Sequence, residues 1–439
     1  MYQAPRGTSD ILPQEQPYWY FIEQKAAEIS RLYGYERIET PVFEDTGLFT
    51  RGVGEATDIV QKEMYSFDDK GGNNITLKPE GTAPVCRAYL EHGMHNLPQP
   101  VKLYYMTPIF RYERPQAGRF RQHHQFGCEA IGEDDPLLDA EIIDIAWKLF
   151  ASLGLKKLMV KLNSIGDRQC RPQYLITLKD YYSKHVDALC SDCKVRLQRN
   201  PLRLLDCKQE TCQEIAKGAP RSVDYLCPEC DAHFASVKKY LGLLKIPFEI
   251  DSRLVRGLDY YTRTVFEVQP EGGGAQSTIG GGGRYDDLME QLGGKHTPAL
   301  GFGTGLERIV LNLKKQGVAV PPLPRPQIFV AYMGDAAREM ALQLADVIRR
   351  AGTGAIVSSG RSLKAQLRQA NSLGVSQTLI LGEDEVKTLT VTVRDMASSQ
   401  QKCVPLADLP EVLMNVAEKT ALRVGVGDVG KARHSYIGE

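Results

Sequence analysis

Residues 107–129 read TPIFRYERPQAGRFRQHHQFGCE, two β-favouring runs joined by a short loop, and this pattern predicts a β-hairpin. The hairpin carries four arginines, Arg111, Arg114, Arg119 and Arg121. Guanidinium groups this close together repel one another unless a polyanion lies between them, and a guanidinium binds phosphate through two parallel hydrogen bonds. The hairpin therefore predicts a nucleotide site, with a solvated charged turn as the alternative.

Other β-rich runs lie on both sides of this hairpin. We expect strands at residues 35–44, 75–78, 101–112, 123–131, 158–162 and 258–268, and helices at residues 14–32, 136–153 and 305–315. Turns rather than regular helices separate most of these strands, which favours an antiparallel sheet over a doubly wound parallel one. The predicted fold class is therefore α+β. Pro41 marks the first of these runs as an edge or interface strand.

A chain of 439 residues is too long for one core of ordinary size, so we expect more than one domain. The first domain is predicted to span residues 1–322, with an insertion rich in charge and cysteine at about residues 167–244. A proline-rich linker follows at residues 323–326. A small α/β module with a βαβαβ pattern is predicted at residues 327–421, and the glycine-rich tail at residues 422–439 is expected to be flexible.

Charge and composition exclude several classes of protein. Lysine and arginine number 54, as do aspartate and glutamate, so net charge gives no evidence for a nucleic-acid ligand, although a local basic patch is compatible with it. With 42% hydrophobic and 25% charged residues, the composition is that of a globular protein. No signal-peptide pattern is present, and no run approaches the roughly 18 apolar residues that a membrane span needs. We therefore expect a cytoplasmic protein with no membrane partner.

An arginine and two adjacent tyrosines precede one of the expected strands, in LVRGLDYYTR at residues 254–263. Alternation along a strand would place Arg256, Leu258 and Tyr260 on one face and Tyr261 on the other, unless a bulge re-aims it. An ordinary aromatic strand is the alternative interpretation.

Two glycine-rich runs follow, IGGGGRYD at residues 279–286 and ALGFGTGLER at residues 299–308. Glycine lets a backbone approach a ligand closely, and an arginine one turn into a helix, as at Arg308, suits a phosphate or an adenine ring. Neither run has the Walker spacing or the strand–GxGxxG–helix order, so P-loop and Rossmann sites are excluded.

Seven of the ten cysteines lie between Cys170 and Cys230. Two CxxC motifs in this region, Cys190 with Cys193 and Cys227 with Cys230, have the spacing that lets paired thiolates bind one tetrahedral Zn²⁺ in a structural role. Cys207 and Cys212 lie between the two motifs. Buried free thiols or disulfides are the alternatives.

The hairpin, the arginine–tyrosine segment and the two glycine-rich runs, in this order, resemble the motifs of class II aminoacyl-tRNA synthetases. Residues 254–261 and 280–286 resemble the two signatures of the histidyl-tRNA synthetase family, and the resemblance extends from residue 6 to the C-terminal module. It implies an antiparallel-sheet catalytic domain with a helical insertion and a C-terminal α/β anticodon-binding domain. It also implies ATP-dependent activation of L-histidine to histidyl-adenylate, followed by transfer to the 3′ end of tRNA(His).

The resemblance assigns the catalytic and ATP-binding residues. It implies that Arg111 holds the α-phosphate of ATP, that Arg308 holds the γ-phosphate, and that Arg256 contacts both the α-phosphate and the carboxylate of histidine. Glu113 and Arg119 complete the implied ATP site, and Mg²⁺ would bridge the remaining phosphates. Such a reaction needs alignment and charge stabilisation but no covalent nucleophile.

The resemblance also implies which residues bind histidine: Glu80, Thr82, Gln125, Glu129, Tyr260 and Tyr261. Glu80 and Gln125 would face the α-ammonium group, and Glu129 with a tyrosine would face the imidazole. Groups that pair both ring nitrogens reject isosteres that lack them, because the buried polar groups would be left without partners. A separate editing site should then be unnecessary.

Contacts with tRNA and with a second chain follow from the same resemblance. Gln116 and Arg121 are the candidate contacts to the acceptor end of the tRNA, and the helix 362–373 offers Lys364 and Arg368 to the anticodon region, unless it is simply a solvated charged face. Arg361 and Gln369 are further candidates at this helix. The helix and strand that lead to Pro41 match the two-fold interface motif of the family and imply a homodimer.

The alternative function is that of a histidine-sensing paralogue, the regulatory subunit of ATP phosphoribosyltransferase, which shares the catalytic fold without aminoacylating tRNA. Such paralogues usually lack the anticodon module and lose the arginine and glutamate sites. The chain keeps Arg111, Glu129, Arg256 and Arg308, together with the C-terminal module. These features favour the synthetase.

Overall fold

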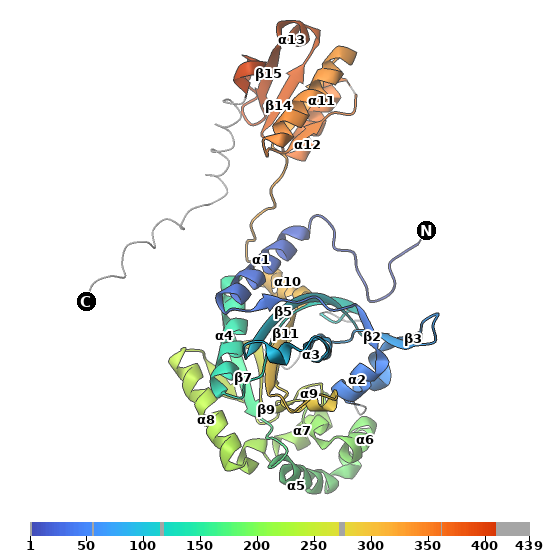
Figure 1. Ribbon diagram of the computed structural model, residues 1–439, viewed down its shortest axis with the longest axis vertical. Coiled ribbons are helices and arrows are strands. Elements are labelled where there is room, and N and C mark those ends of the chain that lie inside the picture. The colour runs from blue at the N-terminus through green and yellow to red at the C-terminus, as the bar shows by residue number, and fades with distance from the viewer. Residues whose placement is uncertain (1, 55–56, 115–117, 272–276, 361, 410–439) are drawn as a thin grey trace, which may run out of the picture. The chain divides into compact units, whose positions relative to one another are not determined.

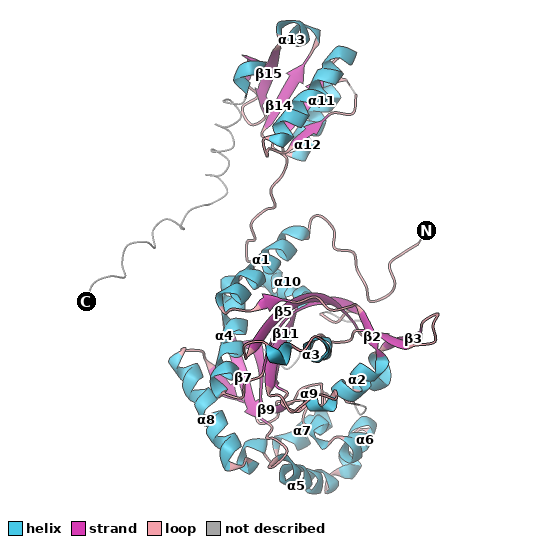
Figure 2. Ribbon diagram, viewed as in Figure 1, coloured by secondary structure: helices cyan, strands magenta, loops and turns pink. Residues whose placement is uncertain are grey.

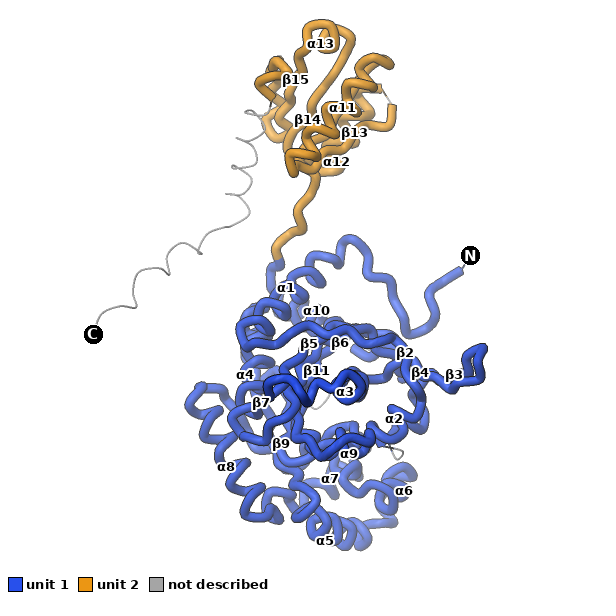
Figure 3. The backbone as a smooth tube through the Cα atoms, viewed as in Figure 1, with its two compact units in different colours: residues 1–320 blue, residues 321–439 orange. Residues whose placement is uncertain are grey.

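The computed structural model describes residues 2–54, 57–114, 118–271, 277–360 and 362–409. The chain forms two compact units, residues 1–320 and 321–439 (Figure 3). Each unit has its own sheet and its own hydrophobic core (Figure 2).

Unit 1 is built on an eight-stranded, mostly antiparallel sheet, which confirms the α+β prediction. In spatial order the strands are β1 (Glu36–Arg37), β5 (Val101–Phe110), β6 (Gln122–Ile131), β11 (Ala299–Gly305), β10 (Gly280–Arg284), β9 (Thr262–Pro270), β7 (Leu158–Ser164) and β8 (Phe248–Ile250). Only the two edge pairs, β1 with β5 and β7 with β8, are parallel. The long hairpin of β5 and β6 lies beside β11 and contains the predicted hairpin.

Four helices cover one face of this sheet: α1 (Gln16–Leu32), α4 (Pro136–Ser152), α8 (Pro228–Leu243) and α10 (Leu306–Lys315) (Figure 1). The carboxylate of Asp135 caps α4 by accepting a hydrogen bond from the backbone N–H of Leu137 at 2.8 Å. Apolar residues surround most of α4, since the helix lies between the sheet and its neighbouring helices. This layer contains most of the apolar core of unit 1.

The other face of the sheet carries α3 (Thr82–Glu91), α9 (Leu288–Gln291) and the part of the insertion that precedes α8, and it also carries the candidate site. The insertion lies between β7 and β8 in the chain and supplies α5 (Arg171–Ser183), α6 (Ser191–Arg199), α7 (Glu210–Lys217) and α8. A small sheet of β2 (Phe43–Asp45), β4 (Asn74–Leu77) and β3 (Tyr65–Asp68) stands next to α2 (Thr46–Val53).

Unit 2 contains a five-stranded sheet in the order β13 (Ala355–Val357), β12 (Ile328–Tyr332), β14 (Gln377–Leu381), β15 (Thr390–Asp395) and β16 (Gln401–Pro405). Helices α11 (Asp335–Arg350) and α13 (Glu383–Thr388) pack on one face, and α12 (Leu363–Leu373) packs on the other. The sequence analysis missed β15 and β16, which pair antiparallel with the parallel core of the sheet. β15 alternates polar and apolar residues, β16 has one buried residue, Val404, and the two strands lie at one side of the sheet.

Two predicted strands begin or break at other places than expected. The run at 35–44 forms only the short strands β1 and β2, because Pro41 has no N–H to donate to a sheet ladder. The run at 258–268 forms a strand only from Thr262 onward, and residues 258–261 lie in a loop.

Arg284, at the end of the glycine strand β10, is fully buried and holds this strand to α4. Its guanidinium donates to the carboxylate of Asp139 at 2.8 Å and to the backbone oxygens of Glu133 and Asp135. Asp139 is also buried and lies 3.2 Å from His233 of α8. Removing one member of a buried ion pair leaves the other charge without compensation.

We expect Arg284→Met to destabilise unit 1 by about 3–5 kcal/mol, because the carboxylate of Asp139 would stay buried without its main partner. Both tryptophans, Trp19 and Trp147, pack in the core of unit 1, so tryptophan fluorescence during urea unfolding reports on this unit. Arg253→Met, at a partly exposed arginine, is the matched control and should change stability by less than about 0.5 kcal/mol. Equal unfolding midpoints for the two variants would contradict this account.

Candidate active site

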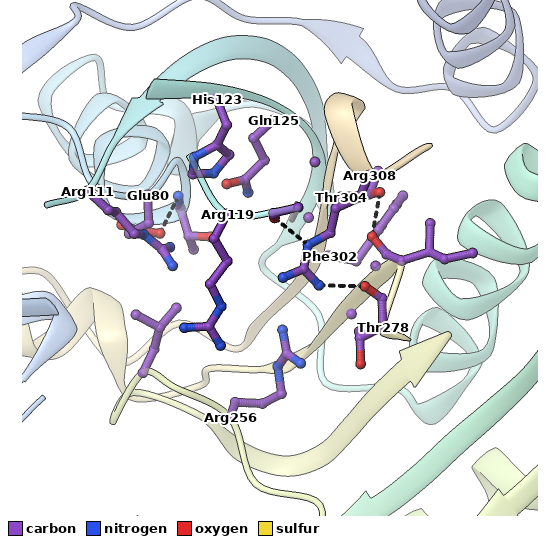
Figure 4. Close-up of a pocket in the computed structure, with 18 of the residues that line it drawn as sticks. Glu80, Arg111, Arg119, His123, Gln125, Arg256, Thr278, Phe302, Thr304 and Arg308 are labelled. Atoms are coloured by element: carbon purple, nitrogen blue, oxygen red, sulfur yellow. Dashed lines mark hydrogen bonds between the residues drawn. The ribbon is translucent and has the colours of Figure 1, made fainter. Parts of the chain in front are cut away.

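A cavity opens on the α3 side of the large sheet, over β6, β10 and β11 (Figure 4). Its walls come from the start of α3, the β5–β6 hairpin, the loop before β9 and the start of α10. The lining residues with charged or polar side chains are Glu80, Thr82, Arg111, Glu113, Arg119, His123, Gln125, Arg256, Tyr260, Tyr261, Thr278, Thr304, Glu307 and Arg308. The cavity therefore gathers residues from five separate segments of the chain.

Four arginines converge on this cavity. Glu113 forms ion pairs with Arg111 and Arg119, and Glu267 with Arg256, whereas Arg308 has no ion pair among the described residues. Figure 4 shows the side chains of Arg119, Arg256 and Arg308 directed into the same space, with Arg111 at its edge. Arg308 donates to the backbone oxygens of Gly118 at 3.2 Å and Thr278 at 2.7 Å. Burial and the neighbouring Arg119 lower the pKa of Arg308. This repulsion would be relieved by a bound anion.

Arg111 and His123 extend the positive region. The guanidinium of Arg111 donates to the backbone oxygen of Pro79 at 2.7 Å, which fixes it beside Glu80. Burial and the cationic side chains of Arg111 and Arg308 lower the pKa of His123 to about 3. His123 is therefore neutral at physiological pH, and the arginines carry the positive charge.

Arg256 projects from the loop before β9 and forms an ion pair with Glu267. Its Nε atom is buried and has no hydrogen-bond partner among the described residues. Its guanidinium lies 6.0 Å from the ring centroid of Tyr261. Part of the donor capacity of Arg256 is thus unused.

Glu80 precedes α3 and is buried at the floor of the cavity. Its carboxylate accepts hydrogen bonds from the backbone N–H groups of Thr82 and Ala83, both at 2.7 Å. Burial raises the pKa of Glu80, although these N–H donors and Arg111 oppose the rise. The Tyr260 hydroxyl lies 3.4 Å from the same carboxylate.

Glu129 lies behind the cavity wall and is only 1% exposed. Its carboxylate accepts hydrogen bonds from the hydroxyls of Thr82 at 2.9 Å, Tyr105 at 3.1 Å and Tyr285 at 2.5 Å. Burial raises the pKa of Glu129 to about 8, even though the Tyr285 and Thr82 donors oppose the rise. Of these donors, Thr82 also lines the cavity.

Two glycines of β11 make room for the polar side chains of β6. Gly301 is paired with Glu129 and Gly303 with Gly127, and the side chain of Gln125 lies across Gly303. A Cβ on Gly301 would lie 1.7 Å from the Glu129 carboxylate, and one on Gly303 would lie 2.2 Å from the Gln125 amide. The glycine-rich run was expected to let the backbone approach a ligand, and it also lets these two side chains lie across the sheet.

Comparison with known proteins places these features in a family. The model of the histidyl-tRNA synthetase family matches residues 7–166 and 185–309, and that of the anticodon binding domain matches residues 327–415. The chain belongs to the histidyl-tRNA synthetase family. It is 61% identical over 410 residues to the histidine–tRNA ligase of Dehalococcoides mccartyi strain 195, covering 93% of this chain and 98% of the relative.

Other relatives agree with this placement. The histidine–tRNA ligase of Desulforamulus reducens is 52% identical over 406 residues, which are 92% of this chain and 97% of the relative. The crystal structure of apo Staphylococcus aureus histidyl-tRNA synthetase matches at a TM-score of 0.79 and 38% identity, covering 94% of this chain and 99% of that one. Among the described residues of this synthetase-family chain, none of the helices is long and apolar enough to cross a membrane.

The prediction for the arginine–tyrosine segment was wrong in its local structure. Residues 254–261 form a loop, so strand alternation does not apply, and both Tyr260 and Tyr261 line the cavity with Arg256. Side chains of the insertion hold this loop: Arg203 donates to the backbone oxygen of Arg256 at 3.2 Å, Arg171 to that of Tyr261 at 2.7 Å, and Asn200 to the carboxylate of Asp259 at 2.5 Å.

The hairpin arginines divide into two groups. Arg111 and Arg119 line the cavity, and Glu113 lies 3.3 Å from Arg119 as an ion pair. Arg121 stacks on the ring of Tyr112 at 3.8 Å and is not among the lining residues. Arg114 is exposed.

The candidate tRNA contact Gln116 lies outside the described residues, as does Arg361 in unit 2.

The predicted metal site, composed of Cys190, Cys193, Cys227 and Cys230, was wrong. The two CxxC motifs lie in separate clusters. The four-cysteine cluster consists of Cys190, Cys193, Cys207 and Cys212, and the aspartate–cysteine cluster consists of Asp167, Cys170, Cys227 and Cys230. The helical fold of the insertion brings each CxxC motif to different partners, which linear spacing does not reveal.

Sequence reasoning missed several residues that shape the site. Tyr105 and Tyr285 bind Glu129, Glu267 binds Arg256, and Thr278 binds Arg308 through its backbone oxygen. The alternation of side chains along β5 and β6 was a usable signal for Tyr105. Gln125, Gly127 and Glu129 lie on the same face of β6, and Tyr105 is paired with Gly127, so its side chain lies on that face too. Nothing comparable in the sequence marks Glu267 or Thr278.

The raised pKa of Glu129 leads to a pH-dependent stability. Because this pKa is about 8 in the folded chain and about 4.3 in an unfolded one, the contribution of Glu129 is full below pH ~4.3 and is lost as pH rises through about 8. We expect Glu129→Gln to gain stability relative to the unsubstituted chain between about pH 5 and pH 9. Urea unfolding followed by tryptophan fluorescence measures this difference.

The control for this measurement is Glu23→Gln, at an exposed position of α1, which should leave the pH profile of stability unchanged. A Glu129→Gln profile parallel to that of the unsubstituted chain would show that Glu129 stays ionised in the fold.

Proposed function

We propose that the chain is a histidine–tRNA ligase that uses ATP to activate L-histidine in this cavity and then transfers it to the 3′ end of tRNA(His). The convergence of four arginines beside the Glu80 carboxylate supports this proposal most strongly, because ATP is a polyanion and an amino acid carries an ammonium group. Membership of the histidyl-tRNA synthetase family supports it independently.

ATP, as its Mg²⁺ complex, would occupy the arginine side of the cavity. Arg111 would hold the α-phosphate and Arg308 the γ-phosphate, with Arg119 and Glu113 at the hairpin completing the site. The support for these roles is that Arg111 and Arg308 are fixed by bonds to backbone oxygens before any substrate binds. Donors that are already oriented need little reorganisation during the reaction.

In the first step, an oxygen of the histidine carboxylate bonds to the α-phosphorus, the bond from that phosphorus to the bridging oxygen breaks, and pyrophosphate leaves. In the second, the terminal ribose hydroxyl of the tRNA attacks the histidyl carbonyl and AMP leaves. Arg256 would contact the carboxylate and the α-phosphate, and its buried Nε is available for such a contact. Alignment and charge stabilisation supply the catalysis.

Histidine would bind with its α-ammonium between Glu80 and Gln125, which both line the cavity. Its imidazole would face Tyr260, Tyr261 and Glu129. A carboxylate accepts about four hydrogen bonds, so Glu129 could accept one from the imidazole in addition to its three hydroxyl donors, of which Thr82 borders the cavity. A ring without both nitrogens would leave these buried groups without partners.

The first test is histidine-dependent exchange of pyrophosphate into ATP, with Arg256→Ala alongside. We expect exchange in the unsubstituted chain and a fall of about 10²–10³-fold in kcat/KM in the variant, because a charge-stabilising donor would be lost. Arg253→Ala is the matched control, since Arg253 lies three residues earlier and is not among the lining residues.

The competing function is that of a histidine-sensing regulatory subunit. A chain described as an ATP phosphoribosyltransferase regulatory subunit/histidyl-tRNA synthetase, from Bacillus halodurans C, matches with a TM-score of 0.61 but only 22% identity, which shows the fold alone. Histidine binding without pyrophosphate exchange would favour this function. The anticodon binding domain at residues 327–415 favours the ligase.

Recognition of tRNA would involve both units. In unit 1 the candidates are Arg121, directly before β6, and Gln116, which lies outside the described residues. In unit 2, Lys364 and Arg368 are exposed on α12 and border a groove that also includes Arg394. Three basic side chains around one groove suit an RNA backbone.

We expect Arg368→Glu to lower kcat/KM for charging of tRNA(His) by about tenfold or more, because a phosphate contact would become a repulsion. Pyrophosphate exchange should stay unchanged, since the activation site lies in unit 1. Lys387→Glu on α13, which packs on the opposite face of the unit 2 sheet, is the control. Equal charging by the two variants would remove α12 from the proposed RNA surface.

A homodimer is the proposed assembly. The segment around Pro41 carries large apolar side chains at the surface, with Val42 40% and Phe43 53% exposed, and Phe67 on the neighbouring small sheet is 46% exposed. Apolar side chains gathered in this way are typical of a protein interface. They lie in the segment that matches the interface motif of the family.

A further inference from the structure

The two cysteine clusters of the insertion use all seven cysteines between Cys170 and Cys230. In each cluster, one potential ligand atom from every residue lies within 4.8 Å of the others. We infer that the insertion binds two structural Zn²⁺ ions, one in the four-cysteine cluster and one in the aspartate–cysteine cluster. This inference does not depend on the proposed function, because metal content is measured without substrates.

The sulfur geometry of the four-cysteine cluster fits a zinc ion. The Sγ atoms of Cys190 and Cys207 are 3.8 Å apart. A Zn–S bond of about 2.3 Å in a tetrahedral site gives S···S edges of about 3.8 Å. All ten cysteines of the chain are free thiols in the structure, so disulfide bonds do not account for the close approach.

Both CxxC motifs have the same local backbone. Cys190 precedes α6 with φ −65° and ψ 162°, and Cys227 precedes α8 with φ −69° and ψ 162°. In each motif the second cysteine, Cys193 or Cys230, lies in the first turn of the helix. This conformation turns two sulfurs toward the same point, as ligation of one metal by a CxxC motif requires.

Backbone N–H groups point at sulfur in both clusters. The N–H of Cys190 donates to the Sγ of Cys212 at 3.4 Å, and the N–H of Asp167 donates to the Sγ of Cys170 at 3.4 Å. Such donors stabilise thiolates, the form that binds zinc. Asp167 would add a carboxylate oxygen to three thiolates, a donor that Zn²⁺ also accepts.

Buried thiols that pack only as small apolar groups are the alternative. Such packing does not require four sulfurs to converge in one cluster, and three sulfurs with a carboxylate in another, within one insertion. The helices α6 and α7 have only nine and eight residues, and helices this short are marginal in water without additional restraints. A metal ion would supply that restraint.

The clusters also lie next to the residues that hold the active-site loop. Asn200 and Arg203, which bind the loop, fall between Cys193 and Cys207 of the four-cysteine cluster. Arg171, which binds the backbone oxygen of Tyr261, directly follows Cys170. The zinc ions would therefore restrain the segments that position Arg256, Tyr260 and Tyr261.

The test is the zinc content of the full chain, purified under reducing conditions without chelators and measured by atomic mass spectrometry. We expect two zinc ions per chain, and one each in Cys207→Ser and Cys227→Ser, which disrupt different clusters. Cys403→Ser, at an exposed cysteine of unit 2, is the matched control and should keep both. In the two cluster variants the KM for histidine should rise by about tenfold or more, since the loop would lose its support.

If the cysteine variants fail to fold, a second measurement on the unsubstituted chain tests the inference without them. The unsubstituted chain, prepared with Co²⁺ in place of Zn²⁺, should show the intense visible absorption of tetrahedral cobalt and a thiolate-to-cobalt charge-transfer band. A chain that contains fewer than two zinc ions and lacks these bands overturns the inference. Loss of all zinc from both Cys207→Ser and Cys227→Ser would indicate one shared site and would also overturn it.

Discussion

The absence of side chains at Gly127, Gly301 and Gly303 is the constraint on which the active site depends. These three glycines lie on the central strands β6 and β11, directly under the cavity. The ring of Tyr105 lies across Gly127, where a Cβ would approach it to 2.4 Å, and Gln125 and Glu129 lie across the other two. The Tyr105 hydroxyl then joins Glu129 and Gln125 by hydrogen bonds of 3.1 and 3.2 Å. The glycines therefore leave room for polar side chains on the sheet face that forms the floor of the cavity.

Above this polar floor, the side chains that line the cavity are rich in positive charge. Four arginines line the cavity, while the acid Glu80 is buried beside Arg111 and Glu129 is buried behind the cavity wall. Burial, together with the positive charge of the neighbouring arginines, lowers the pKa values of Arg308 and His123. Holding these cations close together lowers the folding stability of the chain, and binding of an anion would offset this loss.

Much of this organisation could be predicted from the sequence, and the failures have physical causes. The antiparallel sheet, the hairpin and the residues that line the cavity follow from local patterns and from the family resemblance, because strand periodicity and motif order are encoded locally. The members of the two cysteine clusters could not be grouped correctly, since Cys193 meets Cys207 and Cys212 only after the insertion has folded. The partners of Arg256 and Arg308 are likewise residues distant in sequence, with no motif of their own. Strand β16 gives no strand signal because it has one buried residue, Val404, whereas the Thr-Val alternation of β15 was a usable signal.

Residues 254–261 form a loop, whereas the sequence predicted that a strand begins at residue 258. A strand would send Tyr260 and Tyr261 to opposite faces of the sheet, and only one of them could reach histidine. As a loop, the segment directs Arg256 and both tyrosines into the cavity. A loop without ladder hydrogen bonds must be ordered in another way, since each free residue costs about 1–2 kcal/mol of conformational entropy to fix. Arg171, Asn200 and Arg203 provide that order, so the insertion is part of the machinery that positions the substrate-facing side chains.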